Sequence, residues 1–231
     1  MKRLILLSLL AFSAASAQDG FKSIFNGKDL TGWDGNPELW KVENGEIVGT
    51  TTGPEQLAYN QFLIWRGGVV KNFELKAKIK QAGNNTGIQY RSKELPENGK
   101  WSIGGYQCDI HPAHPNNAMV YEERGRGILA KRGEKTVIKP GPDGKKPVVE
   151  VTGSTGDSAA IQASIKEEQW NEYKIVAKGN HVQHFINGMQ TIDVTDEDAA
   201  NAPKEGLLAL QIHQGPPMKV QFKSFKLVPL K

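Results

Sequence analysis

The amino-acid sequence predicts an all-β protein, built as a sandwich or a barrel. Residues 73–80 alternate apolar and charged side chains without a fault, which is typical of a half-buried antiparallel strand. Asn-Gly pairs at 44–45 and 187–188 lie between apolar runs, and such pairs favour tight hairpin turns. The 231 residues include 25 glycines and 12 prolines, a content that fits many short strands joined by turns.

The expected strands follow one another at short intervals along the chain. Two hairpins are centred on residues 44–45 and 187–188. Further strands are expected at 62–65, 73–80, 87–92, 105–111, 118–122, 172–178, 182–186, 207–213 and 219–228. Short strands with turn signals between them are typical of sandwiches and barrels.

Helical patterns are few. Asp157 is a candidate cap for a short helix over 157–168, and a single turn is expected near 196–200. Residues 131–156 are the least regular stretch, and 139–147, rich in proline, glycine and lysine, are expected to form a long exposed loop. No shift in composition and no repeat divides the chain, so residues 18–231 are expected to form one domain.

The first 17 residues have the pattern of a secretory signal peptide. Lys2 and Arg3 precede an apolar run over 4–12, and small residues follow up to Ala17. The run is shorter than the roughly 20 residues that span a bilayer, so we expect no stable membrane anchor. The protein is therefore expected to be exported, to the periplasm or outside the cell. Removal of residues 1–17 lowers the formal charge from +4 to +2.

Composition excludes several classes of protein. Hydrophobic residues at 38% and charged residues at 23% fit neither a disordered chain nor a polytopic membrane protein. The small, scattered net charge argues against a nucleic-acid partner. The single cysteine, Cys108, forms no intramolecular disulfide and provides no cysteine-based zinc site. It alternates with apolar neighbours, so we interpret it as an inert core thiol.

Three expected strands carry unusual side chains on their outward face. These are amides, an acid, an arginine and imidazoles, which hydrogen-bond vicinal hydroxyls and move protons. If the three strands share one sheet, they form a polar floor; the alternative is an ordinary wet sheet face. The residues are Gln89 and Arg91, then Gln107, Asp109 and His111, then Gln211 and His213.

The run 121–127 places two acids and two arginines beside two glycines. One interpretation is a salt-bridged turn. The other is a loop at the rim of the polar floor, with Glu123 as an acid or base and Arg124 or Arg126 as a clamp for a hydroxyl or an oxyanion. The run has no phosphate-binding P-loop pattern, and no other cofactor motif is evident.

One tryptophan and two further histidines have different expected roles. Trp101, in a polar loop, is the best candidate for an exposed ring that stacks on a sugar. His114, in a loop rich in proline and asparagine, and His184, at an apolar position of its strand, are interpreted as structural.

The order of several motifs resembles the 3-keto-disaccharide hydrolase domain family over nearly all of residues 21–230. Each motif is weak alone, and their order and completeness carry the resemblance. They are Phe25-Asn26-Gly27-Lys28-Asp29-Leu30-Thr31-Gly32-Trp33, residues 83–91, Gly105-Tyr106-Gln107-Cys108-Asp109-Ile110, residues 121–127, Trp170-Asn171-Glu172-Tyr173, Asn187-Gly188, residues 208–213 and Val220-Gln221-Phe222.

The resemblance implies a concanavalin A-like jelly-roll sandwich of two antiparallel sheets with one or two short helices. It also implies an enzyme that cleaves 3-keto-glucosides or disaccharides. The 3-keto group acidifies the hydrogen on C2, so a base removes this proton and the anomeric substituent is expelled. Such a reaction needs a base, a stabiliser for the enolate oxygen and an acid for the leaving oxygen. Some members are thought to use a divalent metal ion for the enolate, so a metal cofactor stays open for this chain. Asp109 is accordingly a candidate base, a candidate metal ligand or a plain surface acid.

Mapped onto this chain, the resemblance favours Asp109 or His213 as base and Glu123 as acid. The expected substrate contacts are Arg91, Gln89, Gln107, Gln211, Arg124, Arg126 and Trp101. Many members carry Glu and Gln where this chain has Gln107 and Asp109, so the acid is moved by two residues along one face. Two alternatives stay open, namely a noncatalytic, lectin-like carbohydrate-binding module and a glucanase-like hydrolase that uses paired carboxylates.

Overall fold

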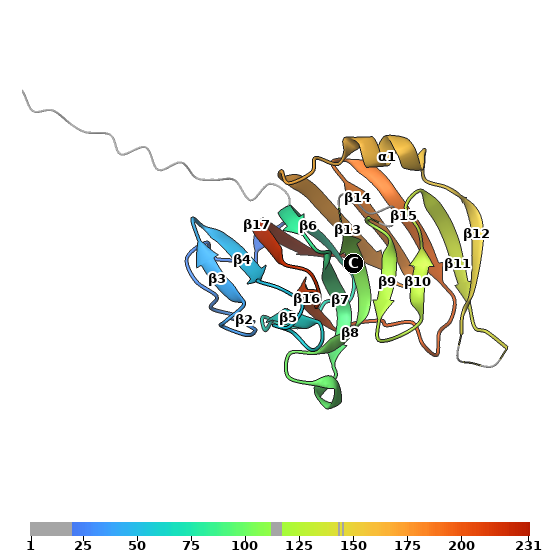
Figure 1. Cartoon of the computed structure of the whole chain (residues 1–231). Helices are drawn as coiled ribbons and strands as arrows, with labels where there is room; N and C mark the ends of the chain where they lie inside the picture. Colours follow the sequence, from blue (N-terminus) through green and yellow to red (C-terminus); the bar gives the residue numbers. More distant parts are fainter. Residues whose placement is uncertain (1–19, 112–116, 143, 145) are drawn as a thin grey trace, which may run out of the picture.

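The computed structural model describes residues 20–111, 117–142, 144 and 146–231, which form two β-sheets packed face to face (Figure 1). Neighbouring strands are antiparallel except for one parallel pair, residues 134–138 with residues 192–196. The segment predicted to be a signal peptide and His114 lie outside the described residues. No helix in the described part of the chain is long and apolar enough to cross a membrane.

The regular elements are nearly all strands. They are β1 (Lys22–Ser23), β2 (Trp33–Asp34), β3 (Trp40–Glu43), β4 (Glu46–Thr51), β5 (Gln61–Trp65), β6 (Phe73–Gly83), β7 (Thr86–Glu94), β8 (Ile103–Ile110), β9 (Val120–Glu123), β10 (Gly127–Ala130), β11 (Glu134–Lys139), β12 (Val148–Ser154), β13 (Asn171–Lys178), β14 (His181–Ile186), β15 (Met189–Asp196), β16 (Leu207–Ile212) and β17 (Met218–Pro229), with the 3₁₀ helix η1 (Pro96–Asn98) and the helix α1 (Ser158–Ser164).

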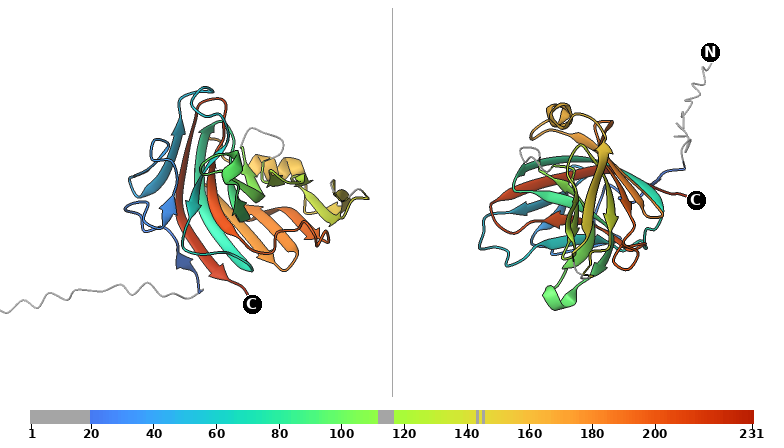
Figure 2. Two further views of the ribbon diagram at one scale, coloured as in Figure 1. Left: turned by 90° about the horizontal axis from the view of Figure 1, so that it is seen from below. Right: turned by 90° about the vertical axis from the view of Figure 1, so that its right-hand side faces the viewer.

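The strands divide into a ten-stranded and a seven-stranded sheet. The first has the order β12-β11-β15-β14-β13-β6-β17-β4-β3, with β1 paired to β17. The second has the order β10-β9-β8-β7-β16-β5-β2. Figure 2 shows that both sheets are curved and that α1 lies outside the two layers. The fold class predicted from the sequence is confirmed.

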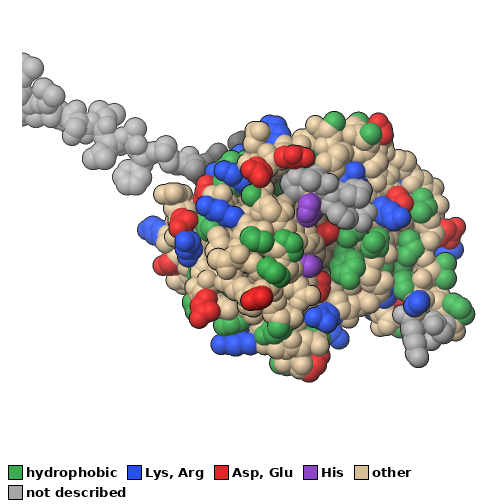
Figure 3. Space-filling view, in the orientation of Figure 1, with side chains coloured by type: hydrophobic (Ala, Val, Ile, Leu, Met, Phe, Trp, Pro, Cys, Tyr) green, Lys and Arg blue, Asp and Glu red, His purple; other side chains and the backbone are tan. Residues whose placement is uncertain are grey.

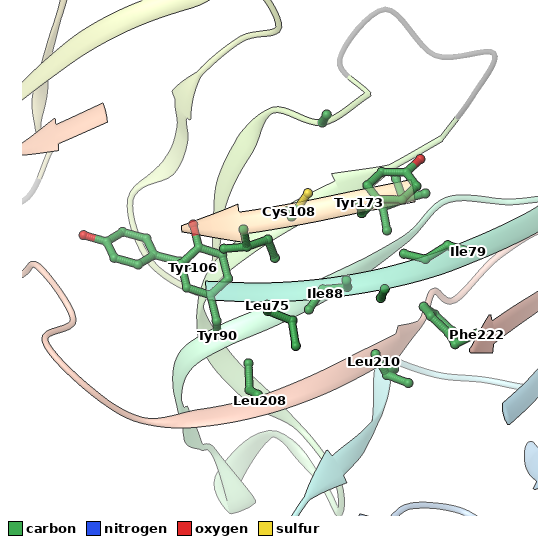
Figure 4. Close-up of a cluster of buried hydrophobic side chains, with 14 of the residues drawn as sticks. Leu75, Ile79, Ile88, Tyr90, Tyr106, Cys108, Tyr173, Leu208, Leu210 and Phe222 are labelled. Atoms are coloured by element: carbon green, nitrogen blue, oxygen red, sulfur yellow. The ribbon is translucent and has the colours of Figure 1, made fainter. Parts of the chain in front are cut away.

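The core lies between the two sheets and follows the period-two pattern of the strands. In β6, the apolar residues at 73, 75, 77 and 79 are buried, while the charged residues between them face outward. Figure 4 shows Tyr90, Tyr106 and Cys108 from the seven-stranded sheet in one apolar cluster with Leu75 and Tyr173. Burial raises the pKa of the Cys108 thiol well above its ordinary value, as expected of an inert core cysteine.

Both predicted hairpin turns are confirmed by their backbone angles. Asn44 and Gly45 have φ values of 51° and 76°, and Asn187 and Gly188 have φ values of 48° and 84°. Positive φ at both central residues defines the tight turn that joins twisted antiparallel strands.

The stretch 131–156 differs from the prediction, because it contains the hairpin β11–β12. Its β12 strand is an exposed sheet edge, with every residue solvent-accessible, so it lacks the apolar alternation that identifies a half-buried strand. The helix is shorter than predicted: Asp157 caps α1 as expected, but the chain is already extended at Ile165. Near 196–200 the strand β15 ends and a turn follows, without a helix.

Candidate active site

The three strands that carry the unusual outward side chains are neighbours in the seven-stranded sheet. Strand β7 lies between β8 and β16, with Gln89 opposite both Gln107 and Ala209. Gly87 lies opposite Asp109 in the next row. The predicted polar floor is therefore present on the outer face of this sheet.

A cavity of about 410 Å³ opens above this floor. Six of the predicted site residues line it, and histidine and acidic side chains lie next to one another near the centre of the face shown in Figure 3. These six are Gln107, Asp109, Glu123, Arg124, Gln211 and His213. The other lining residues are Asn60, Asn85, Met119, Tyr121, Gly125 and Gln214.

Asp109 is anchored by side-chain amides. Its Oδ1 atom accepts hydrogen bonds from Gln107 Nε2 at 2.9 Å and from Asn85 Nδ2 at 3.4 Å. Gln107 folds over Gly87 to make this contact, since a Cβ atom at residue 87 would approach its Cγ and Cδ to 2.5 Å. The missing side chain at Gly87 therefore provides the space in which the amide meets the carboxyl group.

A chain of three amides extends from Asp109 across the floor. With Asp109 as a carboxylate, which only accepts, Gln107 must direct its Nε2 toward it. The same Nε2 atom lies 3.4 Å from Gln211 Oε1, and Gln107 Oε1 accepts from Gln89 Nε2 at 2.9 Å. This arrangement leaves Gln211 Nε2 without a partner among the described residues.

The amide chain has a second consistent arrangement. Turning the Gln89 amide over lets its Nε2 atom donate to the carbonyl oxygens of Tyr106 and Gly105, at 2.9 and 3.2 Å. Gln107 then turns as well and presents Oε1 to Asp109, which requires a donor at residue 109. The orientation of the amides therefore depends on whether the side chain of residue 109 carries a hydrogen that it can donate.

Glu123 lies in the same cavity at the end of β9. Its side chain is 10% exposed, and burial raises the pKa of the carboxyl above the ordinary value for glutamate. The nearby Asp109 raises the pKa further, whereas a hydrogen bond from Asn60 and the charges of Arg124 and His213 oppose this rise. A carboxyl that retains its proton to higher pH than an ordinary glutamate is suited to act as a general acid.

His213 follows β16 and is half-buried. Its Nδ1 atom lies 2.6 Å from the carbonyl oxygen of Gln214, which only accepts hydrogen bonds. The same Nδ1 atom lies 3.4 Å from Asn84 Nδ2, but this amide donates to the Gln214 carbonyl oxygen at 2.9 Å, so the shorter contact decides the tautomer. The neutral ring therefore carries its hydrogen on Nδ1 and has the lone pair on Nε2, so Nε2 is the atom that can accept a proton. Asn60 connects this segment to the acid, since its Oδ1 accepts from the Gln214 amide at 3.0 Å and its Nδ2 donates to Glu123 at 3.3 Å.

Arg91 was predicted to contact the substrate, but it does not line the cavity that contains Asp109. A bulge in β7 and a φ of 49° at Arg91 break the alternation of the strand. Its guanidinium donates to the backbone carbonyl oxygens of Lys71 and Gly179, both at 2.8 Å. Arg91 therefore ties loops together at one end of the sandwich.

The two arginines of the run 121–127 have different surroundings. Arg124 is exposed at the rim of the cavity, with its Nε 3.8 Å from Glu123 Oε1. Arg126 is buried and forms ion pairs with three carboxylates, so for this residue the salt-bridged interpretation is correct. The distances are 2.5 Å to Glu122, 2.6 Å to Asp196 and 3.3 Å to Asp198.

Trp101 and Gln89 also lie outside the cavity. Trp101 is half-buried against a small apolar cluster, its Nε1 donates to Asp34 at 2.9 Å, and the Lys100 ammonium lies over its ring. The expected exposed ring is therefore not present. Gln89 is fully buried beneath Gln107, so it reaches the site only through the amide chain. His184 is buried in the core beside Tyr90, as predicted.

Sequence reasoning missed three side chains of the site. Asn60 and Asn85 lie in connections outside the regular strands, where no periodicity marks them. Tyr121 lies two residues before Glu123 on β9, so both side chains point to the same face of the sheet. This alternation is the sequence signal that would have identified Tyr121. Burial raises the pKa of the Tyr121 hydroxyl above its ordinary value.

The donor set does not fit a preformed site for the metal ion associated with the family resemblance. Within the described residues, no three His, Cys, Asp or Glu side chains are arranged to hold a metal ion. Asp109 Oδ1 and Glu123 Oε1 accept hydrogen bonds from side-chain amides instead. No step is therefore assigned to a metal.

Similarity to solved structures is high in fold and low in sequence. A candidate glycosyl hydrolase from Parabacteroides distasonis matches with a TM-score of 0.59 at 18% identity, over 91% of this chain and 99% of that one. The carbohydrate-binding module CBM66 from Bacillus subtilis matches with a TM-score of 0.56 at 14% identity, over 85% and 95%. A β-glucanase from Bacillus licheniformis matches with a TM-score of 0.54 at 11% identity, over 92% and 100%.

These structures share the two-sheet sandwich of the concanavalin A-like jelly roll. No curated protein matches the chain. The model of one protein family, the 3-keto-alpha-glucoside-1,2-lyase-like domain, matches residues 20–228. This match spans almost every described residue and every strand of both sheets, so the chain belongs to the 3-keto-alpha-glucoside-1,2-lyase-like domain family.

Proposed function

We propose that this protein is an exported enzyme that cleaves the glycosidic bond of 3-keto-glucosides by elimination. The observation that carries the proposal is the presence of Asp109, Glu123 and His213 around one cavity, with burial favouring the protonated form of Glu123. Family membership supports a carbohydrate substrate. The predicted signal peptide supports export.

The reaction needs one group that removes a proton and one that donates a proton. His213 is the stronger candidate for the base, because its Nε2 atom carries the lone pair of the neutral ring. Asp109, held by Gln107 and Asn85, is the alternative base, and otherwise it accepts a hydrogen bond from a sugar hydroxyl.

The proposed steps balance without a redox partner. The base removes the C2 proton, electrons of the C2–H bond form the C1–C2 double bond, and the C1–O bond breaks. Glu123 donates its proton to the leaving oxygen, which departs as an alcohol. Negative charge develops on the C3 oxygen, and the exposed Arg124 guanidinium at the rim of the cavity is the candidate for stabilising it. Water then adds to the unsaturated keto sugar.

The test uses a 3-keto-glucoside with a chromogenic aglycone and the parent glucoside with an intact C3 hydroxyl as the matched control. We expect aglycone release and an unsaturated keto sugar from the first compound only. Equal release from both compounds would indicate direct hydrolysis of the glucanase type. Binding of the keto sugar without turnover, with or without added divalent ions, would indicate a carbohydrate-binding module and overturn the proposal.

A further inference from the structure

The outer face of the ten-stranded sheet carries a dense group of lysines on its three adjacent strands β13, β6 and β17. Their outward positions hold eight lysines and two glutamates, although the whole chain has a formal charge of only +4. We call this group the lysine face. It comprises Lys76, Lys78, Lys80, Lys174, Lys178, Lys219, Lys223 and Lys226, with Glu74 and Glu172 among them.

Like charges lie directly opposite one another on this face. Lys76 is paired in register with Lys174 on one side and Lys226 on the other, and Lys78 is paired with Lys223 on one side and with Glu172 on the other. Such cross-strand partners lie about 5 Å apart, and like charges at this spacing destabilise a sheet. The face therefore retains a repulsion between Lys76 and its two lysine neighbours that one acidic substitution at residue 76 would remove.

Few of these charges are neutralised by carboxylates. Lys76 pairs with Glu74 at 3.3 Å and Lys223 with Glu46 at 3.0 Å. Over the described ranges of the chain, no carboxylate lies within ion-pair distance of Lys78, Lys174 or Lys226. The centre of the lysine face is thus a cationic surface with unused donors.

Aromatic rings hold three of the ammonium groups in place. The Nζ atoms of Lys76, Lys174 and Lys223 lie 4.4, 3.8 and 3.6 Å from ring centroids. The rings are those of Phe21, Phe185 and Trp170 respectively. A ring on one side restricts the ammonium group and leaves its remaining N–H groups for an oxygen acceptor.

We propose that the lysine face binds a linear acidic polysaccharide. The rows of ammonium groups run across neighbouring strands, so they can follow a chain of carboxylate or sulfate groups by charge complementarity. A lipid surface fits less well, because membrane-binding faces insert exposed apolar side chains. The exposed large apolar residues of the described chain all lie outside β13, β6 and β17.

This site is separate from the cavity that contains Asp109. The cavity lies on the outer face of the seven-stranded sheet, and the core separates it from the lysine face. The polymer would therefore be held while the cavity remains open to a small glycoside. The proposal does not depend on which reaction the cavity performs.

The test compares binding of the intact protein to dextran sulfate and alginate with binding to uncharged dextran at about 0.15 M salt. The variant K78E/K174E/K226E reverses three charges at the centre of the face. The control K71E/K93E/K204E makes the same change of charge at exposed lysines outside it. We expect the first variant to lose at least about tenfold in affinity for both acidic polymers and the control to lose less than about threefold.

Thermal unfolding shows whether a loss of binding comes from a loss of folding. K78E/K174E/K226E should melt close to the unchanged protein, because glutamates at 174 and 226 form opposite-charge pairs with Lys76 and the glutamate at 78 forms one with Lys223, which offsets its new like-charge pair with Glu172. If this variant does not fold, single Lys→Gln changes at 78 and 226 serve in its place. Equal losses in both triple variants, equal binding to dextran, or tighter binding to vesicles of anionic lipid would overturn the proposal.

Discussion

The side-chain amide of Gln107 lies over the Cα atom of Gly87, in the space that a side chain at residue 87 would fill. A Cβ atom there would come within 2.5 Å of Gln107 Cγ and Cδ and within 2.8 Å of its Nε2. Gly87 is absent from the positive-φ positions, so alanine is compatible with its backbone. The effect of adding a methyl group at this position is therefore confined to the amide.

Gly87→Ala is expected to move the Gln107 amide away from Asp109 and lower kcat by about 10- to 100-fold, since small displacements of catalytic groups are costly. The free energy of unfolding should fall by about 1–3 kcal/mol, as for overpacking. Gly53→Ala is the matched control, because nothing lies within 4 Å of a Cβ atom at that position. Steady-state kinetics and urea unfolding measure both effects. Unchanged kcat in Gly87→Ala would contradict a role for the Gln107 contact.

Glu123→Gln is expected to lower kcat by about 10²–10⁴-fold, the usual contribution of a general acid. In the unchanged protein, activity should fall on the alkaline side as Glu123 ionises, above the ordinary pKa of glutamate. This alkaline limb should be absent from the pH profile of the variant. Glu97→Gln, an exposed position in η1, is the control. An alkaline limb that persists in Glu123→Gln would assign the acid to another group.

The free energy of unfolding should also depend on the protonation of the Glu123 carboxyl. The folded-state pKa of Glu123 lies above the unfolded value, so its stabilising contribution is full below the unfolded pKa and is lost as pH rises through the folded pKa. The stability of Glu123→Gln relative to the unchanged protein should therefore increase with pH across this window. Urea unfolding at a series of pH values measures the difference, and a difference that decreases with pH would contradict a raised pKa.

Asp109→Asn is expected to preserve the fold, because the Asn Nδ2 atom supplies the donor that the second amide arrangement needs. Gln107 Oε1 then accepts from residue 109, and Gln89 donates to the backbone of the neighbouring strand. The Gln211 amide, whose Oε1 lies 3.4 Å from the terminal atom of Gln107, turns as well and donates to Gln107 Oε1. Gln107→Glu instead places a second buried carboxyl 2.9 Å from Asp109. It should cost about 1–3 kcal/mol near neutral pH, and less in acid, where the pair shares a proton.

Chemical unfolding at neutral and acidic pH separates these two variants. The double variant Gln107→Glu/Asp109→Gln exchanges the acid and the amide between the two positions and should recover the stability lost in Gln107→Glu alone. If Asp109→Asn were the less stable single variant, the coupling between the amides and residue 109 would be contradicted.

The chemistry of the floor was visible in the sequence because strand periodicity is local. Gln107, Asp109, Gln211 and His213 all follow from counting alternate residues along two strands. That β16 lies beside β7 depends on pairings between residues more than 100 positions apart, such as Ala209 and Gln89, which no local pattern records. The family resemblance, which depends on the order of motifs along the whole chain, supplied the two-sheet topology.

The sequence failed at residues whose placement depends on backbone irregularity or tertiary contact. Arg91 left the predicted floor because a bulge interrupts β7, and no residue nearby signals that bulge. Asn60 lies in the connection before β5, and its hydrogen bonds with Glu123 and Gln214 place it in the site. Strand β12 was missed because it is exposed on both faces, so its side chains carry no alternation.

Arg124 and Arg126 provide a final test, since they are two residues apart and have opposite surroundings. Arg126→Met leaves the carboxylates of Glu122, Asp196 and Asp198 buried without their cation. This should cost about 3–5 kcal/mol of unfolding free energy, as for other broken buried pairs. Arg124, with 44% of its side chain exposed, should tolerate methionine within about 0.5 kcal/mol.

The pH dependence of activity should change in the Arg124 variant and not in the Arg126 variant, the reverse of the effect on stability. The Arg124 charge lowers the pKa of Glu123, so Arg124→Met should raise that pKa further and move the alkaline limb of the pH profile to higher pH. Arg126→Met, assayed at a temperature where it is folded, should leave the limb in place, because the Arg126 charge is satisfied by its own carboxylates. Equal shifts in both variants would mean that Arg124 acts on Glu123 only through general charge, and not through its position beside the carboxyl.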